Sequence, residues 1–153
     1  MLLPVLLGRD WNIAADVWSV TSFTELRRSG LEAERKNLAR SVHQRQVTWV
    51  EECLDPNYGP VIAVSDYVRT VPDLIRPWVH RRYITLGTGG FGRSDTRTAL
   101  RSFFEIDHKA IALTAISALA DEGLVNRSLI SDFMDRYGYR PSLCAAGLDG
   151  RCE

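Results

Sequence analysis

Apolar positions along the chain fall into short strand-like runs separated by longer helix-like segments. Residues 61–65 form a continuous apolar run between turn residues, which is typical of a strand buried on both faces. Residues 83–86 form the next such run. Residues 14–20 are rich in β-branched and aromatic side chains, a composition that also favours a strand. The pattern therefore predicts three strands.

The segments around the first predicted strand favour helices. Residues 2–11 are amphipathic, and Ser22-Phe23-Thr24-Glu25 fits a capping box, in which the serine hydroxyl accepts a hydrogen bond from the third amide of a helix. We predict that this helix ends near residue 29, with Gly30 as its stop. Residues 31–46 are charged and carry few apolar positions, so they are predicted to be a solvated helix or an irregular crossing.

Helices are also predicted through most of the second half of the chain. They cover residues 47–54, residues 66–79 with a break at Pro72, residues 96–104 after an Asp95 cap, residues 109–121 after an Asp107 cap, and residues 126–137 from Asn126. Apolar side chains nearly encircle the helix at 109–121, which indicates a buried helix, and Gly123 is predicted to end it.

Strands that alternate with helices in this way predict an α/β fold with a mostly parallel sheet. Residues 1–140 are expected to form one domain, followed by an irregular tail at residues 141–153. The opening helix pattern lacks a clear start, so we expect an earlier strand of the sheet to be missing. An uncovered sheet edge invites self-association, and we expect poor solubility or oligomers when the chain is expressed alone.

Composition narrows the class of protein. The chain has 153 residues, of which 45% are hydrophobic and 25% charged, as expected for one globular domain. Lys plus Arg equals Asp plus Glu at 19 each, which argues against non-specific nucleic-acid binding. No apolar run is long enough to span a bilayer, and residues 1–7 lack the basic leader of a signal peptide. We therefore expect a cytoplasmic protein without nucleic-acid or membrane partners.

Neither the cysteines nor the histidines predict a metal or disulfide site. Cys53, Cys144 and Cys152 contain no CxxC pair and are interpreted as thiols in a reducing compartment. His43, His80 and His108 are scattered and have no metal-ligand spacing. The neighbouring carboxylates Glu51-Glu52 and Glu32/Glu34 are interpreted as solvated helix faces and not as a catalytic pair.

A glycine-rich turn follows the last predicted strand. Gly87-Thr88-Gly89-Gly90-Phe91-Gly92 formally matches GxGxxG, and a strand-to-helix turn of this kind can hold a phosphate. No Gly-Lys-Ser/Thr follows, and the strand is not followed by a complete βαβ unit with a ribose-binding acid. A structural or interface loop is therefore the favoured interpretation.

Two further sets of polar residues are open to two interpretations. Ser65-Asp66 and Ser94-Asp95 follow strands and could be site residues, but serine and aspartate also cap helices, which is the favoured role. Arg93, Arg97 and Arg101 are spaced four apart and are expected to share one helical face. That face would be either solvated or available to a small anion.

Four blocks of sequence resemble one family. Residues 16–26 (DVWSVTSFTEL), Ser65-Asp66-Tyr67, residues 86–97 (LGTGGFGRSDTR) and residues 103–107 (FFEID) occur in the same order in the C-terminal domain of the homodimeric bacterial pyruvate dehydrogenase first component. The shorter pattern of Gly87, Phe91, Gly92 and Ser94 is similar to the transketolase C-terminal domain. The resemblance covers about residues 6–136.

The resemblance implies a three-layer α/β/α sandwich that supports a dimer. In this family, thiamine diphosphate and magnesium are bound by N-terminal and middle domains that the 153 residues do not contain. The implied chain binds no cofactor, carries no catalytic or metal-binding residue and is inactive alone. Its implied partners are a second copy, the absent domains of the parent enzyme and the dihydrolipoyl acetyltransferase complex.

The glycine turn is then interpreted as a structural or interface loop. Its members are Gly87, Gly89, Gly90, Phe91, Gly92, Arg93, Ser94 and Asp95. The family usually has aspartate at the position of Gly89, so this bend lacks an acceptor that its relatives have. The alternative is a stand-alone interaction module that docks on a full-length or split enzyme, or binds a small anion at the glycine turn.

Overall fold

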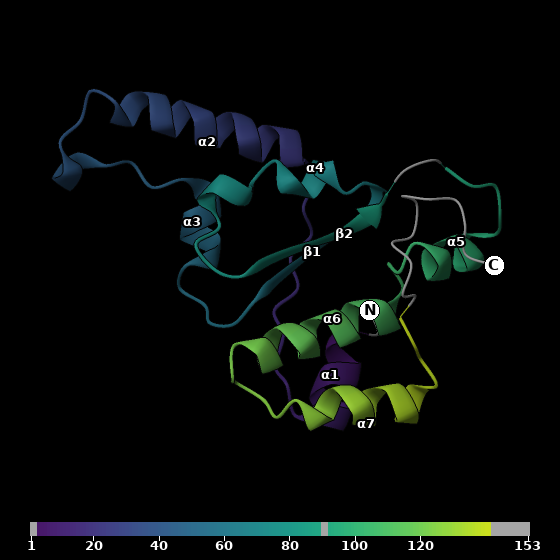
Figure 1. The fold of residues 1–153 in the computed structure, drawn as a ribbon. Coiled ribbons are helices and arrows are strands. Elements are labelled where there is room, and N and C mark those ends of the chain that lie inside the picture. The colour runs from purple at the N-terminus through teal and green to yellow at the C-terminus, as the bar shows by residue number, and fades with distance from the viewer. Residues whose placement is uncertain (1–2, 90–91, 142–153) are drawn as a thin grey trace.

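The centre of the fold is a parallel pair of strands between two layers of helices (Figure 1). The structure is a computed structural model that describes residues 3–89 and 92–141. Strand β1 (Val61–Val68) pairs with β2 (Tyr83–Thr88). Helices α2 (Phe23–Asn37) and α4 (Thr70–Asp73) lie on one side, and α1 (Leu3–Trp11), α6 (His108–Asp121) and α7 (Ser128–Tyr137) lie on the other. The predicted α/β class is confirmed.

Shorter elements connect these layers. They are η1 (Val42–Gln44), α3 (Trp49–Leu54), η2 (Arg76–Trp78) and α5 (Arg97–Phe103). Two apolar clusters hold the molecule together. One joins α1, α6 and α7 around Ile116 and Phe133, both fully buried. The other packs Val50, Ile75 and Trp78 between α3 and the sheet.

The packing of the two strands leaves no room for a side chain at Gly87. Val61 faces Tyr83 and Val64 faces Leu86, and the register then shifts before Val68 pairs with Thr88. A Cβ atom on Gly87 would lie 2.8 Å from the carbonyl oxygen of Tyr67. No side chain fits in that space, so the first glycine of the turn is required by strand packing.

The segment predicted as a first strand does not form one. Residues 14–20 are outside any ladder, and the side chains of Val17 and Trp18 are 60% and 55% exposed. Within the described residues the sheet is two-stranded, and this segment pairs with neither strand. The β-propensity of its residues reflects packing against cross-strand neighbours, and without them the prediction is wrong.

Helix α2 also differs from the prediction, because Gly30 lies inside it and does not end it. The Gly30 backbone is buried against Trp78, and a Cβ atom there would lie 2.5 Å from the indole ring. The glycine therefore serves close packing between two elements. Ser22 caps the helix as predicted, but Glu25 pairs with Arg28.

In the second half of the chain, several strand and helix boundaries differ from the predicted ones, each for a local reason. Strand β1 continues through Ser65 and Asp66 to Val68, so those two residues are not helix caps, and only short helices follow before β2. Thr96, and not Asp95, caps α5. Asp107 caps α6 as predicted, and Gly123 takes the left-handed φ of 73° after its end.

Candidate functional site

A cleft of about 970 Å³ opens beside the carboxyl end of β1. Its walls come from residues 20–24, from residues 64–67, and from side chains of α5 and α6 that include Arg101 and His108. This is the edge of a parallel sheet where ligands bind in open α/β folds. The polar residues around the cleft are therefore the first candidates for a functional site.

Most polar groups around the cleft already serve the local backbone. The Ser22 hydroxyl accepts from the amide of Glu25 at 3.2 Å. The Ser65 hydroxyl accepts from the amide of Tyr67 at 3.1 Å. Asp107 accepts from two amides in the first turn of α6 at 3.0 and 2.8 Å. These side chains act as caps and turn residues, and they form no nucleophile–base pair.

One cationic side chain in the cleft, Arg101 on α5, has no ion-pair partner within the described residues. Asp66 and Asp107 line the same cleft, so the local charge is mixed.

The glycine turn continues from β2 toward α5. Gly90 and Phe91 lie outside the described residues, and Gly92 to Asp95 are exposed. The Arg93 guanidinium lies 3.8 Å from the Asp95 carboxylate and 4.9 Å from the centre of the Phe103 ring. Arg93 precedes α5, so the predicted shared helical face holds only for Arg97 and Arg101.

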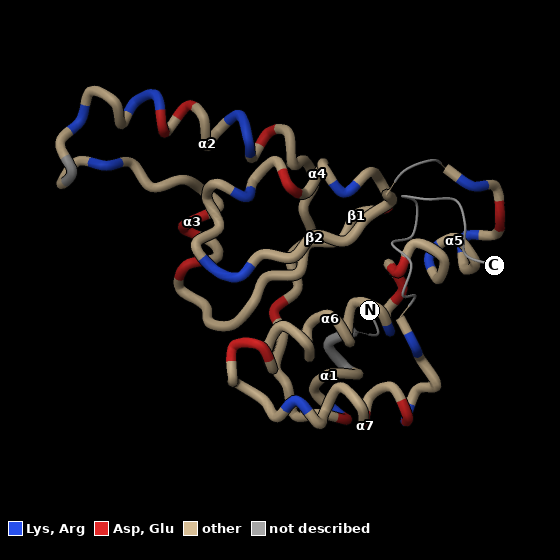
Figure 2. Tube along the Cα trace, viewed as in Figure 1, with Lys and Arg blue, Asp and Glu red and all other residues tan. Residues whose placement is uncertain are grey.

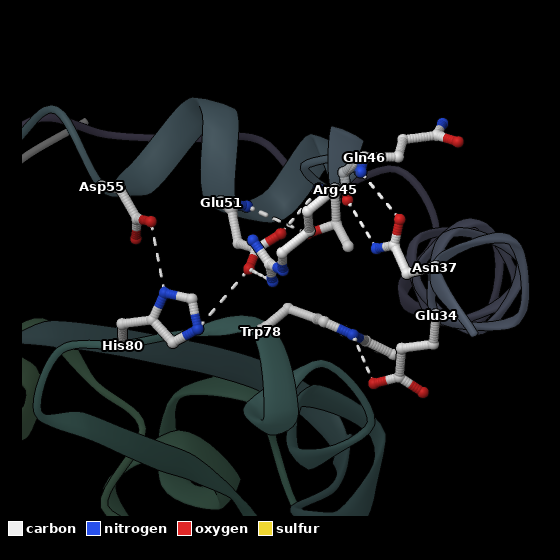
Figure 3. Close-up of polar contacts among 9 residues, drawn as sticks. Glu34, Asn37, Arg45, Gln46, Glu51, Asp55, Trp78 and His80 are labelled. Atoms are coloured by element: carbon white, nitrogen blue, oxygen red, sulfur yellow. Dashed lines mark hydrogen bonds and ion pairs between the residues drawn. The ribbon is translucent and has the colours of Figure 1, made fainter. Parts of the chain in front are cut away.

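A buried carboxylate, Glu51, was missed by sequence reasoning. Its side chain is fully buried, whereas Glu52 beside it is exposed as predicted. Figure 3 shows Glu51 between Arg45 and His80. Glu51 Oε1 lies 2.5 Å from Arg45 Nη2 and 3.5 Å from His80 Nε2, and Glu51 Oε2 accepts from the Thr48 amide at 2.6 Å.

The Glu51 carboxylate is held in its charged form. Burial opposes ionisation, but the hydrogen bonds from Arg45 and Thr48 outweigh that effect and lower the pKa of Glu51 below its ordinary value. His80 also contacts Asp55, with its Nδ1 atom 3.2 Å from Oδ2. A carboxylate that already accepts from several donors is a structural junction and not a free base.

The signal that could have revealed Glu51 is present in the sequence. Thr48 and Glu51 are three residues apart and form a complete capping box at the start of α3. The predicted helix began at residue 47, so Thr48 was placed inside the helix and was not considered as its cap. These contacts link α3 to the segment before β2.

Residues 3–89 and 92–141 contain no group of three or more His, Cys, Asp or Glu side chains that could hold a metal ion. A separate finding concerns membranes: across residues 3–89 and 92–141, no helix has both the length and the apolar character to cross one.

Comparison with known proteins shows which family the chain resembles. Residues 5–107 match the family described as the transketolase-like TK C-terminal domain. The pyruvate dehydrogenase E1 component of Cupriavidus necator is 46% identical over 137 residues, which are 90% of this chain and 15% of the relative. The E1 component of Pseudomonas aeruginosa is 47% identical over 137 residues, 89% of this chain and 16% of the relative.

The similarity extends to more distant relatives. The pyruvate dehydrogenase E1 component of Escherichia coli is 35% identical over 133 residues, 86% of this chain and 15% of the relative. The chain thus spans about 15% of the length of the curated relatives that it matches. The match to the family and the α/β arrangement of the helices and strands agree, so the chain belongs to the transketolase-like C-terminal domain family.

Proposed function

We propose that this chain is the C-terminal structural domain of a thiamine-diphosphate-dependent pyruvate dehydrogenase and has no catalysis of its own. The observation that carries the proposal is 46% identity with a pyruvate dehydrogenase E1 component over 90% of the chain. Ser22, Ser65 and Asp107 in its cleft are engaged in caps and turns, which supports a structural role. The reaction would be the decarboxylation of pyruvate by the assembled enzyme.

In this proposal, thiamine diphosphate and magnesium are held by other domains. The partners are those domains, a second copy of the enzyme and, in the larger assembly, dihydrolipoyl acetyltransferase. A feature of the surface supports contact with other polypeptides. Val17, Trp18 and Val20 are 60%, 55% and 40% exposed within one segment of four residues. Contiguous exposed apolar side chains mark interaction surfaces.

A chimera tests the proposal. The matching 137 residues of the Cupriavidus necator relative are replaced by the corresponding residues of this chain, and pyruvate decarboxylation is measured with thiamine diphosphate and magnesium. We expect turnover by the chimera and none by the purified chain alone. The intact relative and the relative without the matching segment are the controls.

Two outcomes would overturn the proposal. Turnover by the isolated chain would show that it carries catalytic residues. A chimera that folds cooperatively and has the same subunit stoichiometry as the intact relative, but does not turn over pyruvate, would show that the domain cannot serve this enzyme. Circular dichroism melts and sedimentation separate that result from simple misfolding.

A further inference from the structure

Helix α2 presents one face to the core and one flank to solvent. Its inner face carries Gly30 and Ala33, both buried, and the Trp78 indole donates to Glu34 Oε1 at 2.9 Å. The exposed flank carries Arg27, Leu31, Arg35 and Leu38, whose spacings of four, four and three residues place them along one line. We refer to these four residues as the α2 flank.

The α2 flank exposes two leucines among charged residues. Leu31 is 44% exposed and Leu38 is 88% exposed. Single exposed leucines need no explanation, but these two lie on one line between arginines. A surface of this kind can bury apolar side chains of a partner while its rim makes charged contacts.

The α2 flank and its neighbouring loop also carry a local excess of positive charge. Residues 25–49 contain six Lys and Arg but three Glu, although the chain as a whole has a formal net charge of zero. Arg28 and Lys36 pair with glutamates within α2, and Arg45 pairs with Glu51. Arg27, Arg35 and Arg40 form no ion pair within the described residues. Figure 2 shows the basic residues along α2 and the loop after it.

A groove of about 420 Å³ lies beside the α2 flank. Its lining includes Leu38, Pro77 and Trp78, together with Arg45, which pairs with Glu51, and Glu34, which accepts from the Trp78 indole. The loop that forms one end is pinned to the helix, because the Asn37 side chain donates to the Gln46 carbonyl at 2.9 Å and accepts from the Gln46 amide at 2.7 Å (Figure 3). The groove is therefore preformed, which lowers the entropic cost of binding.

We propose that the α2 flank and this groove bind an acidic amphipathic helix of a partner protein. Unpaired arginines on one line select carboxylates, and the two leucines select apolar side chains at helical spacing. Charge complementarity thus identifies the partner by its chemistry. The proposal rests on exposed side chains of α2 and is independent of the reaction proposed above.

The test uses the full chain and a synthetic helical peptide of about 18 residues, long enough for about five turns. The peptide carries leucine on one face and glutamate elsewhere. Binding is measured by calorimetry at low and high salt. We expect saturable binding that weakens as salt rises, and about tenfold weaker binding for the double variant Arg27→Glu/Arg35→Glu. Leu31→Ser/Leu38→Ser is expected to weaken binding without changing the salt dependence.

Matched controls keep the proposal falsifiable. Arg97→Glu/Arg101→Glu reverses two exposed arginines on α5 that are also four residues apart, and it is expected to leave binding unchanged. A scrambled peptide with leucines on all faces is expected to bind less tightly. No binding, an equal effect of the α5 variant, or equal binding of the scrambled peptide would overturn the proposal. Tighter binding to phosphatidylserine vesicles than to the peptide, lost in the α2 variant, would assign this surface to membranes instead.

Discussion

The buried Glu51 carboxylate and its donors Arg45 and Thr48 predict how much stability is lost when one buried charge is removed. Glu51→Ala leaves Arg45 and the Thr48 amide without their acceptor, and it is expected to lower the free energy of unfolding by about 1–3 kcal/mol. Glu52→Ala is the control, because Glu52 is exposed and its loss is expected to change stability by no more than about 0.5 kcal/mol. Urea denaturation compares the two. Equal effects would contradict the buried junction.

The same residue predicts a pH dependence with a defined sign. The folded pKa of Glu51 is lowered, so its contribution is fully present above the unfolded pKa and is lost as pH falls through the folded pKa. The stability difference between the wild type and Glu51→Gln is therefore expected to shrink on acidification. A difference that grows as pH falls would contradict this assignment.

At the scale of single residues, sequence patterns identified which side chains cap helices but not which side chains are buried. Ser22 and Asp107 were predicted as caps from their type and position, and both are caps. The Thr48–Glu51 spacing marks Glu51 as a capping residue, but its burial depends on contacts with Arg45 and His80 in other segments. Local pattern specifies which backbone groups need a partner, whereas burial depends on how distant segments pack.

At the scale of elements, two helical glycines predict opposite effects of alanine. Alanine normally stabilises a helix interior by about 1 kcal/mol relative to glycine. Gly8→Ala in α1 is expected to stabilise, because the new Cβ would meet only the Ile13 carbonyl oxygen at 3.9 Å. Gly30→Ala is expected to destabilise by about 1–3 kcal/mol, because its Cβ would lie 2.5 Å from the Trp78 ring.

Thermal unfolding of the two variants provides the measurement. Opposite signs of the change in melting temperature would support the packing of α2 on Trp78. If Gly30→Ala raises the melting temperature as Gly8→Ala does, that packing is wrong. The comparison controls for intrinsic propensity, because both positions lie inside helices.

Elements with a strong local pattern were predicted, and those that depend on neighbours were not. The runs at 61–65 and 83–86 are strands, and the encircled apolar pattern at 109–121 is the buried helix α6. Residues 14–20 have strand composition but pair with no strand among the described residues. A strand is stable only in a ladder, so composition alone could not decide that segment.

At the scale of the whole molecule, the cleft contains Ser65 and Asp66 near the carboxyl end of β1, together with side chains of α5. None of the glycine-turn residues that the structure describes lines this cleft. The roles of the polar groups there depend on hydrogen bonds to nearby amides, which the sequence does not show. Gly87 is fixed by the backbone of Tyr67, a contact between segments 20 residues apart.

The exposed apolar segment predicts that the isolated chain self-associates. Val17 and Trp18 are more than half exposed, and β1 has a partner strand on one edge only within the described residues. A formal net charge of zero provides no repulsion between copies.

Sedimentation velocity is therefore expected to show oligomers whose fraction rises with concentration. Val17→Lys/Trp18→Lys is expected to shift the chain toward monomer, because it replaces two exposed apolar side chains with charged ones. Leu124→Lys, at a residue 59% exposed after α6, is the control and is expected to leave the distribution unchanged. A monomer at every concentration would show that the chain covers this surface itself.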